Sequence, residues 1–346
     1  MAPTLISVEE RREQMALAEA DGVQYIGRCP DDLDEKWIDV PLPDGQTNRT
    51  KVVWPKSSAA NPLRCPLIVY IHGGGFITGT PDLVLAPARG FASMFSAVVA
   101  CPSLNQLPEQ PFPAPIKIAW EVCSWLSDAN NLNNGVLRQD GTTVDLDRGF
   151  IVGGLSAGGT ASAVIGGIFG STAAKLSTFS NLTSLQHPIT GIFCNLPMLV
   201  TDAMVPKHYE QDFKSRIENA DPDGFNITQI RELEKLIGDF VHTPWFSPIN
   251  LDTSDPSSTQ NHPKKVFIYC GGLDPFRDDA IVYHKWLSAL PGVESRLSVL
   301  ENSNHVAWAT PAYPAYHTRE VKEVALDGMS WLLGKKWDSS GKDLPI

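Results

Sequence analysis

The sequence of 346 residues predicts an α/β protein built on a mainly parallel, doubly wound sheet of eight strands. Short apolar runs such as residues 67–71 are typical of strands that are buried on both faces. These runs alternate along the chain with helical patterns such as residues 114–128, and this alternation is how parallel strands are connected. The composition, with 42% hydrophobic residues and 9 Trp, is sufficient for a large core.

The chain begins with a helical pattern at residues 5–20, which we expect to pack apart from the main sheet. Residues 37–40 and 51–54 flank the turn sequence Pro-Asp-Gly at 43–45, which predicts an antiparallel hairpin. Six further strands and three further helices follow, separated by a proline-rich loop and an Asn/Gly-rich surface loop. The strands are expected at 67–71, 97–101, 150–152, 189–194, 265–270 and 296–300, the helices at 114–128, 160–168 and 318–334, and the loops at 105–113 and 130–143.

The alternation of strands and helices stops between residues 200 and 250. Two polar helical patterns, 207–218 and 226–240, follow one another there without a strand between them. We therefore predict a helical cap made of residues 201–250, with a contribution from residues 1–30. The core would consist of residues 31–200 and 251–346.

The predicted strand at 150–152 leads into the sequence Gly154-Leu-Ser-Ala-Gly158, which fits the pattern G-x-S-x-G. A strand that turns sharply into a helix forces its corner residue into a strained conformation, and the flanking glycines leave room for it. Ser156 is therefore the candidate nucleophile. The alternative interpretation is an ordinary turn rich in Gly and Ser.

A serine nucleophile needs a base and a group that orients the base, and on a sheet of this kind they follow in the order serine, acid, histidine. His305 comes directly after the last predicted strand and is the candidate base. Asp274 follows the strand 265–270 by a tight glycine turn and is the candidate acid. Asp278 and Asp279 are the competitors for that role, although both fit better in the first turn of a helix.

The sequence His72-Gly73-Gly74-Gly75-Phe76 follows the strand 67–71. Backbone N–H groups that no Cβ atom covers can surround the oxyanion that forms when serine attacks an ester. We expect Gly74 and Gly75 to donate, with Gly73 shaping the turn and Ala157 supplying a further N–H group. A phosphate-binding loop is the alternative, but neither G-x-x-x-x-G-K-[ST] nor G-x-G-x-x-G occurs.

Taken together, these motifs resemble the hormone-sensitive-lipase branch of the α/β-hydrolases. The residues that carry the resemblance, which extends from about 30 to 335, are His72–Phe76, Pro108–Pro113, Gly154–Gly159, Gly272–Asp279 and Asn304-His305. The resemblance implies an ester hydrolase with a helical cap, a Ser156–His305–Asp274 triad and an oxyanion hole at Gly74, Gly75 and Ala157. Two positions depart from the family: Leu155 replaces its usual acidic residue, and the segment 104–107 replaces a tyrosine-arginine-leucine-alanine sequence.

Three functions remain open at this stage. The first is a serine esterase for a small hydrophobic molecule, and the second is a tailoring enzyme of natural products that uses the same site for acyl transfer, elimination or cyclisation. The third is a small-molecule receptor, a reading that the retained His305 disfavours. Candidate substrate contacts are Phe76, Leu155, Phe213, Trp245 and Phe246.

Charge and cysteine usage limit the partners. The net charge of −11 argues against nucleic acid and anionic membranes. The six cysteines occur singly, which argues against a zinc site or a disulfide framework, and the chemistry requires no cofactor. We see no signal peptide and no membrane span, so we expect a cytoplasmic protein, and a homodimer is left open.

Overall fold

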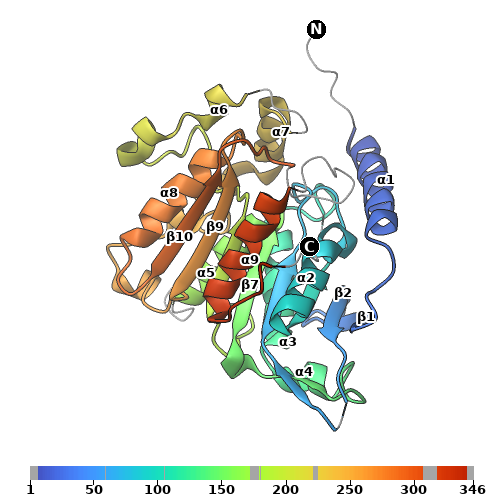
Figure 1. Ribbon diagram of the computed structural model, residues 1–346. Coiled ribbons are helices and arrows are strands. Elements are labelled where there is room, and N and C mark those ends of the chain that lie inside the picture. The colour runs from blue at the N-terminus through green and yellow to red at the C-terminus, as the bar shows by residue number, and fades with distance from the viewer. Residues whose placement is uncertain are drawn as a thin grey trace.

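The computed structural model describes residues 7–58, 60–104, 106–171, 179, 181–220, 225–306 and 318–340. Its centre is an eight-stranded sheet with the strand order β1-β2-β5-β4-β7-β8-β9-β10 (Figure 1). The strands from β5 to β10 are parallel, whereas β2 pairs antiparallel with both β1 and β5. The predicted sheet is thus confirmed. Its strands are β1 Leu33–Pro41, β2 Thr47–Pro55, β4 Leu67–Ile71, β5 Val98–Pro102, β7 Phe150–Leu155, β8 Gly191–Asn195, β9 Lys265–Gly271 and β10 Glu294–Leu300.

Helices cover both faces of this sheet. Tyr70 and Phe193 lie on one face, where the ring of Tyr70 packs edge-on against Phe91 of α2 (Leu85–Phe95) at 5.4 Å. The helix α9 (Arg319–Leu333) packs on the same face, because a Cβ at Gly328 would overlap the Phe267 ring.

The opposite face is covered by α5 (Ala157–Gly170), α3 (Ala114–Leu126) and α8 (Arg277–Ser288). Ile192 points to this side, and a Cβ at Gly166 of α5 would lie 3.1 Å from it. His262 joins α5 to α8, since it lies beside Gly166 and its ring contacts Trp286. Between the two layers of helices, β4, β5, β7 and β8 are buried along their whole length, as their apolar sequences predicted, whereas β10 at the edge of the sheet is partly exposed.

The segment 130–143 differs from the predicted loop. It contains the end of a short helix, α4 (Ala129–Asn133), and the start of β6 (Thr142–Val144), which pairs with β3 (Leu63–Cys65). Asp128 caps α4 by accepting a hydrogen bond from the N–H of Asn130, and the N–H of Val144 donates to the side chain of Asn133. Side-chain hydrogen bonds of this kind stabilise short helices and strands such as α4 and β6, which have no periodic pattern of apolar residues that would predict them.

The helical segment after residue 200 is more broken than the sequence suggested. The predicted helix 207–218 is a 3-10 helix, η4 (Lys207–Asp212), followed by α6 (Ser215–Glu218). The interruption has a cause in Asp278, whose carboxylate accepts hydrogen bonds from the N–H groups of Lys214 and Ser215.

The second predicted helix is α7 (Ile227–Ile237), which begins with a capping box made by Asn226 and Gln229 and is followed by η5 (Gly238–His242). Figure 1 shows α6 and α7 beyond one end of the sheet, and α1 (Val8–Ile26) at its side. The division into a core and a cap stays a prediction. Asn105, in the predicted proline-rich loop, lies outside the described residues.

Candidate active site

Ser156 occupies the corner between β7 and α5. Its backbone has φ 53° and ψ −114°, which is a strained conformation for a residue with a side chain. The turn is closed by the N–H of Ser156, which donates to the carbonyl oxygen of Asn195 at 2.8 Å. The glycines on either side are sterically required: a Cβ at Gly154 would lie 2.6 Å from the Ile71 carbonyl oxygen, and one at Gly158 only 2.0 Å from it.

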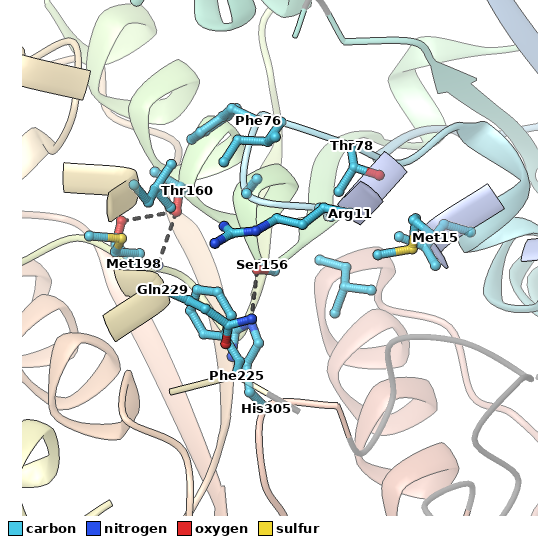
Figure 2. Close-up of a pocket in the computed structure, with 18 of the residues that line it drawn as sticks. Arg11, Met15, Phe76, Thr78, Ser156, Thr160, Met198, Phe225, Gln229 and His305 are labelled. Atoms are coloured by element: carbon cyan, nitrogen blue, oxygen red, sulfur yellow. Dashed lines mark hydrogen bonds between the residues drawn. The ribbon is translucent and has the colours of Figure 1, made fainter. Parts of the chain in front are cut away.

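A continuous chain of hydrogen bonds connects three side chains that are distant in the sequence. Ser156 Oγ lies 2.9 Å from His305 Nε2, and His305 Nδ1 lies 2.9 Å from Asp274 Oδ2 (Figure 2 draws the first contact). Asp274 is fully buried and His305 is 7% exposed, so water competes little for these bonds. The sequence-predicted serine, histidine and aspartate are therefore brought together by the fold.

The strands β9 and β10 position the acid and the base at one edge of the sheet. A Cβ at Gly271 would lie 2.2 Å from the Ser303 carbonyl oxygen, so the two loops that carry Asp274 and His305 meet closely. The second carboxylate oxygen of Asp274 accepts a 2.8 Å hydrogen bond from the N–H of Phe276, which fixes the orientation of the carboxylate.

The imidazole of His305 is held on both sides by aromatic rings. Phe225 stacks on it at 5.1 Å, and Phe276 packs edge-on at 5.0 Å. With Nδ1–H donated to Asp274, Nε2 carries the lone pair that can accept the proton of Ser156. The arrangement can thus activate an alcohol as a nucleophile.

The glycine loop after β4 lies against this corner. Gly74, Gly75 and Phe76 have φ values of 104°, 63° and 58°. The carbonyl oxygen of Gly74 points back into the loop, where it accepts hydrogen bonds from the N–H groups of Ile77 and Thr78, both at 3.0 Å. A Cβ at Gly73 would lie 3.3 Å from Ser156 Cβ, which shows how closely the loop approaches the nucleophile.

His72 anchors the base of the same loop in a neutral state. Its Nδ1–H donates to the Gly73 carbonyl oxygen at 2.7 Å, and its Nε2 accepts from the N–H of Leu104 at 3.2 Å. Complete burial lowers the pKa of His72 to about 4. Among the described residues, no hydrogen bond uses the N–H groups of Gly74, Gly75 or Ala157, so they are free to receive an oxyanion.

A cavity of about 240 Å³ opens onto Ser156 and His305. Of the predicted substrate contacts, Phe76, Leu155 and Phe246 line it. The structure does not bring Phe213 and Trp245 to this cavity, which differs from the expectation. Phe213 packs on the guanidinium of Arg216 at 5.3 Å. Trp245 packs edge-on against Phe179 at 4.8 Å and lines a separate cavity.

Several cavity residues were not anticipated from the sequence. Six of them belong to the helices α1 and α7, and Figure 2 labels Arg11, Met15 and Gln229 among these: Arg11, Gln14, Met15, Ala18, Gln229 and Leu233. The others come from further segments of the chain: Ile77, Thr78, Leu83, Thr160, Met198, Phe225, Phe276 and Val306. The apolar positions of α7 carried a signal for a packed helix face, but nothing in its pattern indicated that the face lies above Ser156.

Asp278 and Asp279 do lie in the first turn of α8, and both are buried. Asp279 pairs with the guanidinium of Arg216 and accepts hydrogen bonds from the N–H groups of Leu199 and Val200, at 2.8 and 2.9 Å. Burial raises the pKa of Asp279 to about 7, although these partners oppose the rise. These carboxylates therefore tie the segments 199–200 and 214–216 to α8, in addition to complementing its dipole.

Two further findings concern the described part of the chain. No group of three His, Cys, Asp or Glu side chains is placed there to hold a metal ion. No helix in these ranges combines the length and the hydropathy that a bilayer crossing requires.

The chain matches one family model and is similar to several known proteins. A family model described as alpha/beta hydrolase fold matches residues 68–309. An AB hydrolase superfamily protein of Schizosaccharomyces pombe is 27% identical over 331 residues, 94% of this chain and 85% of that protein. Esterase LipI of Mycobacterium tuberculosis is 28% identical, over 69% of this chain and 65% of that protein. The crystal structure of vibralactone cyclase superposes with a TM-score of 0.78 at 21% identity, covering 96% of this chain and 91% of that one.

Proposed function

Because the chain belongs to the α/β-hydrolase family, as its motifs predicted, we propose that it is a carboxylic-ester hydrolase that forms an acyl-enzyme on Ser156. One observation supports this function most directly: two consecutive 2.9 Å hydrogen bonds link Ser156 to His305 and His305 to Asp274. The similarity to a protein named as an esterase supports the reaction class.

In the proposed mechanism, His305 takes the proton of the Ser156 hydroxyl as the oxygen attacks the ester carbonyl. The resulting oxyanion accepts hydrogen bonds from the N–H groups of Gly74, Gly75 and Ala157, while Gly73 shapes the turn. His305 then gives its proton to the departing alcohol, which leaves an acyl group on Ser156. Water attacks that acyl group with His305 again acting as the base. This step releases the carboxylic acid and regenerates the free serine.

The expected substrate is the ester of a small hydrophobic molecule. The cavity walls near Ser156 are formed largely by apolar side chains, including Phe76, Leu155 and Phe246. Leu155 is 3% exposed and faces the cavity with an aliphatic side chain where the resembled family has an acidic one. The mechanism uses no cofactor. A cytoplasmic location and a homodimer stay predictions.

A tailoring reaction is the second candidate. A hydroxyl of the substrate itself could attack the acyl-enzyme in place of water, which would release a lactone and return the proton through His305. The largely apolar lining of the cavity is compatible with this reaction, because it can hold the hydrocarbon chain of a substrate beside the acyl group. The similarity to vibralactone cyclase concerns the fold and is compatible with either reaction. Elimination on the same residues and a receptor role have no comparable observation in their favour.

Two measurements test the proposal. A fluorophosphonate should label the protein stoichiometrically, and peptide mapping should locate the label on Ser156. With the p-nitrophenyl ester of a hydroxy acid in ¹⁸O-water, hydrolysis should place ¹⁸O in the released acid, whereas lactone formation by the hydroxyl of the acyl group leaves the product without ¹⁸O. Absence of both labelling and ester cleavage would contradict the serine mechanism.

A further inference from the structure

One side chain gives the apolar cavity a fixed positive charge. Arg11, on the N-terminal helix α1, is the sole lysine or arginine among the described residues that line the cavity. Figure 2 shows its side chain extending into the space beside Ser156 and His305. A guanidinium offers five N–H donors and stays charged at any physiological pH, so its environment must supply acceptors.

The residues around Arg11 supply hydrogen-bond acceptors for only some of its N–H groups. One terminal nitrogen pairs with the carboxylate of Glu232 on α7. The Nε–H group is buried, and no acceptor among the described residues takes it. The side chain as a whole is 14% exposed. Nη1 also forms no hydrogen bond with a described residue and, unlike Nε, is not buried, so it is the N–H donor that a ligand in the cavity can reach.

Arg11 is not required to attach α1 to the rest of the molecule, since two other contacts do so. Arg12 donates to both carboxylate oxygens of Glu109 at 2.7 and 2.8 Å, and to the carbonyl oxygens of Ile77 and Leu107. Further along the helix, Glu19 accepts hydrogen bonds from the N–H and hydroxyl groups of Thr80 at 2.7 and 3.0 Å. The neighbouring arginines thus differ: Arg12 secures the helix, and Arg11 points into the cavity.

We propose that Arg11 is a specificity-determining residue that donates a hydrogen bond to a second, neutral carbonyl group of the ester substrate. This inference rests on the proposed esterase function and names its substrate class. Glu232 already balances the charge of Arg11, so a substrate carboxylate would bring two negative groups to one guanidinium, whereas a ketone, amide or second ester carbonyl adds an acceptor without net charge. The apolar walls would hold the hydrocarbon chain between the two carbonyl groups.

The test compares esters that differ only in the second carbonyl. The substrates are p-nitrophenyl octanoate, its analogues with an oxo group at carbon 4, 5, 6 or 7, and the monoester of suberic acid. We expect at least one oxo ester to exceed octanoate in kcat/KM by roughly tenfold or more, as one well-placed hydrogen bond allows, and the suberate monoester not to do so. Arg11→Met should lower the ratio of kcat/KM for the preferred oxo ester to kcat/KM for octanoate to about one.

Matched variants separate substrate contact from helix docking. Arg11→Lys keeps the charge but lacks the planar fork in which one terminal nitrogen pairs with Glu232 while the other donates to the substrate, so it should also lose the oxo preference. Arg12→Met weakens the attachment of α1 and should affect octanoate and the oxo esters alike. An Arg11→Met variant that lowers kcat/KM equally for all esters would overturn the inference, as would a preference for the suberate monoester in the unmodified protein.

Binding measurements keep this inference independent of the proposed function. Ser156→Ala cannot turn over the ester, so calorimetry can compare the dissociation constants of methyl octanoate and the methyl oxooctanoates directly. We expect tighter binding of an oxo ester by roughly tenfold, and the loss of this difference when Arg11→Met is added. Equal affinities would refute the role of Arg11. Failure of hydrolysis with a retained binding preference would refute only the esterase function.

Discussion

The first turn of α5 touches the end of β4 at Gly158 and Ile71, where a Cβ at residue 158 would lie 2.0 Å from the Ile71 carbonyl oxygen. This close approach places the nucleophile corner beside the loop that follows β4. The loop that begins at Gly73 therefore lies next to Ser156, although more than 80 residues separate the two in the sequence. The geometry of the site depends on this glycine contact as much as on the reactive side chains.

Removing the nucleophile should abolish most turnover. Ser156→Ala deletes the hydroxyl that His305 activates, and we expect kcat on short-chain p-nitrophenyl esters to fall at least ~10³-fold with little change in stability. Ser171→Ala is a matched control, because Ser171 lies at the other end of α5 and bonds only to backbone carbonyl oxygens in the described structure. Unchanged turnover in the Ser156 variant would remove the acyl-enzyme mechanism.

Changing the acid should affect catalysis through the orientation of His305. Asp274→Asn removes the buried negative charge that stabilises the imidazolium, so we expect kcat to fall by roughly 10³–10⁴-fold with KM little changed. Steady-state kinetics of Asp278→Asn provide the comparison, since that carboxylate contacts the N–H groups of Lys214 and Ser215 instead. Equal losses in both variants would indicate that Asp274 acts through general stability.

Two neighbouring glycines should respond differently to the same substitution. A Cβ at Gly74 would lie 2.0 Å from the Thr78 carbonyl oxygen, so Gly74→Ala must move the loop, and we expect kcat to fall by roughly 10²-fold or more. A Cβ at Gly75 would meet only Leu233, at 3.8 Å, so Gly75→Ala should cost about 1–2 kcal/mol of backbone strain and retain more activity. Equal kcat values in the two variants would contradict the described loop conformation.

Buried histidines should make the fold sensitive to acid. Burial lowers the pKa of His262 to about 4, while the unfolded chain titrates near its ordinary value of 6.5. The unfolded state therefore binds more protons below pH 6.5, and stability falls as the pH drops from 6.5 towards 4. The shift corresponds to about 3 kcal/mol below pH 4.

Denaturant unfolding across this pH range checks the prediction. His262→Gln should lose less stability than the unmodified protein as the pH falls, and the two should respond alike above pH 7. Gly45→Ala, in an exposed turn where no atom lies within 4 Å of the new Cβ, is a control that should keep the full pH dependence. A pH dependence in His262→Gln equal to that of the unmodified protein would contradict the predicted titration.

The sequence by itself determined the sheet and the three reactive side chains. Each buried strand is a continuous apolar run, which is a local pattern, and β4 has the bounds that this pattern predicts. Ser156 and Asp274 follow such strands, and His305 follows the more polar edge strand β10, so their place at one edge of the sheet follows from the shared direction of the parallel strands. The resemblance of the motifs to a known family pointed to the same residues.

Only the tertiary structure decided what surrounds them. The aromatic side chains of Phe213 and Trp245 suggested that they line the substrate cavity. In the structure they pack on Arg216 and Phe179 instead. Arg11 looked like one more charge on a polar helix, and its entry into the cavity depends on how α1 docks through Arg12 and Glu19. These contacts join segments that lie far apart in the chain. The periodicity of a helix shows which of its faces is apolar, but it does not show which distant segment packs against that face.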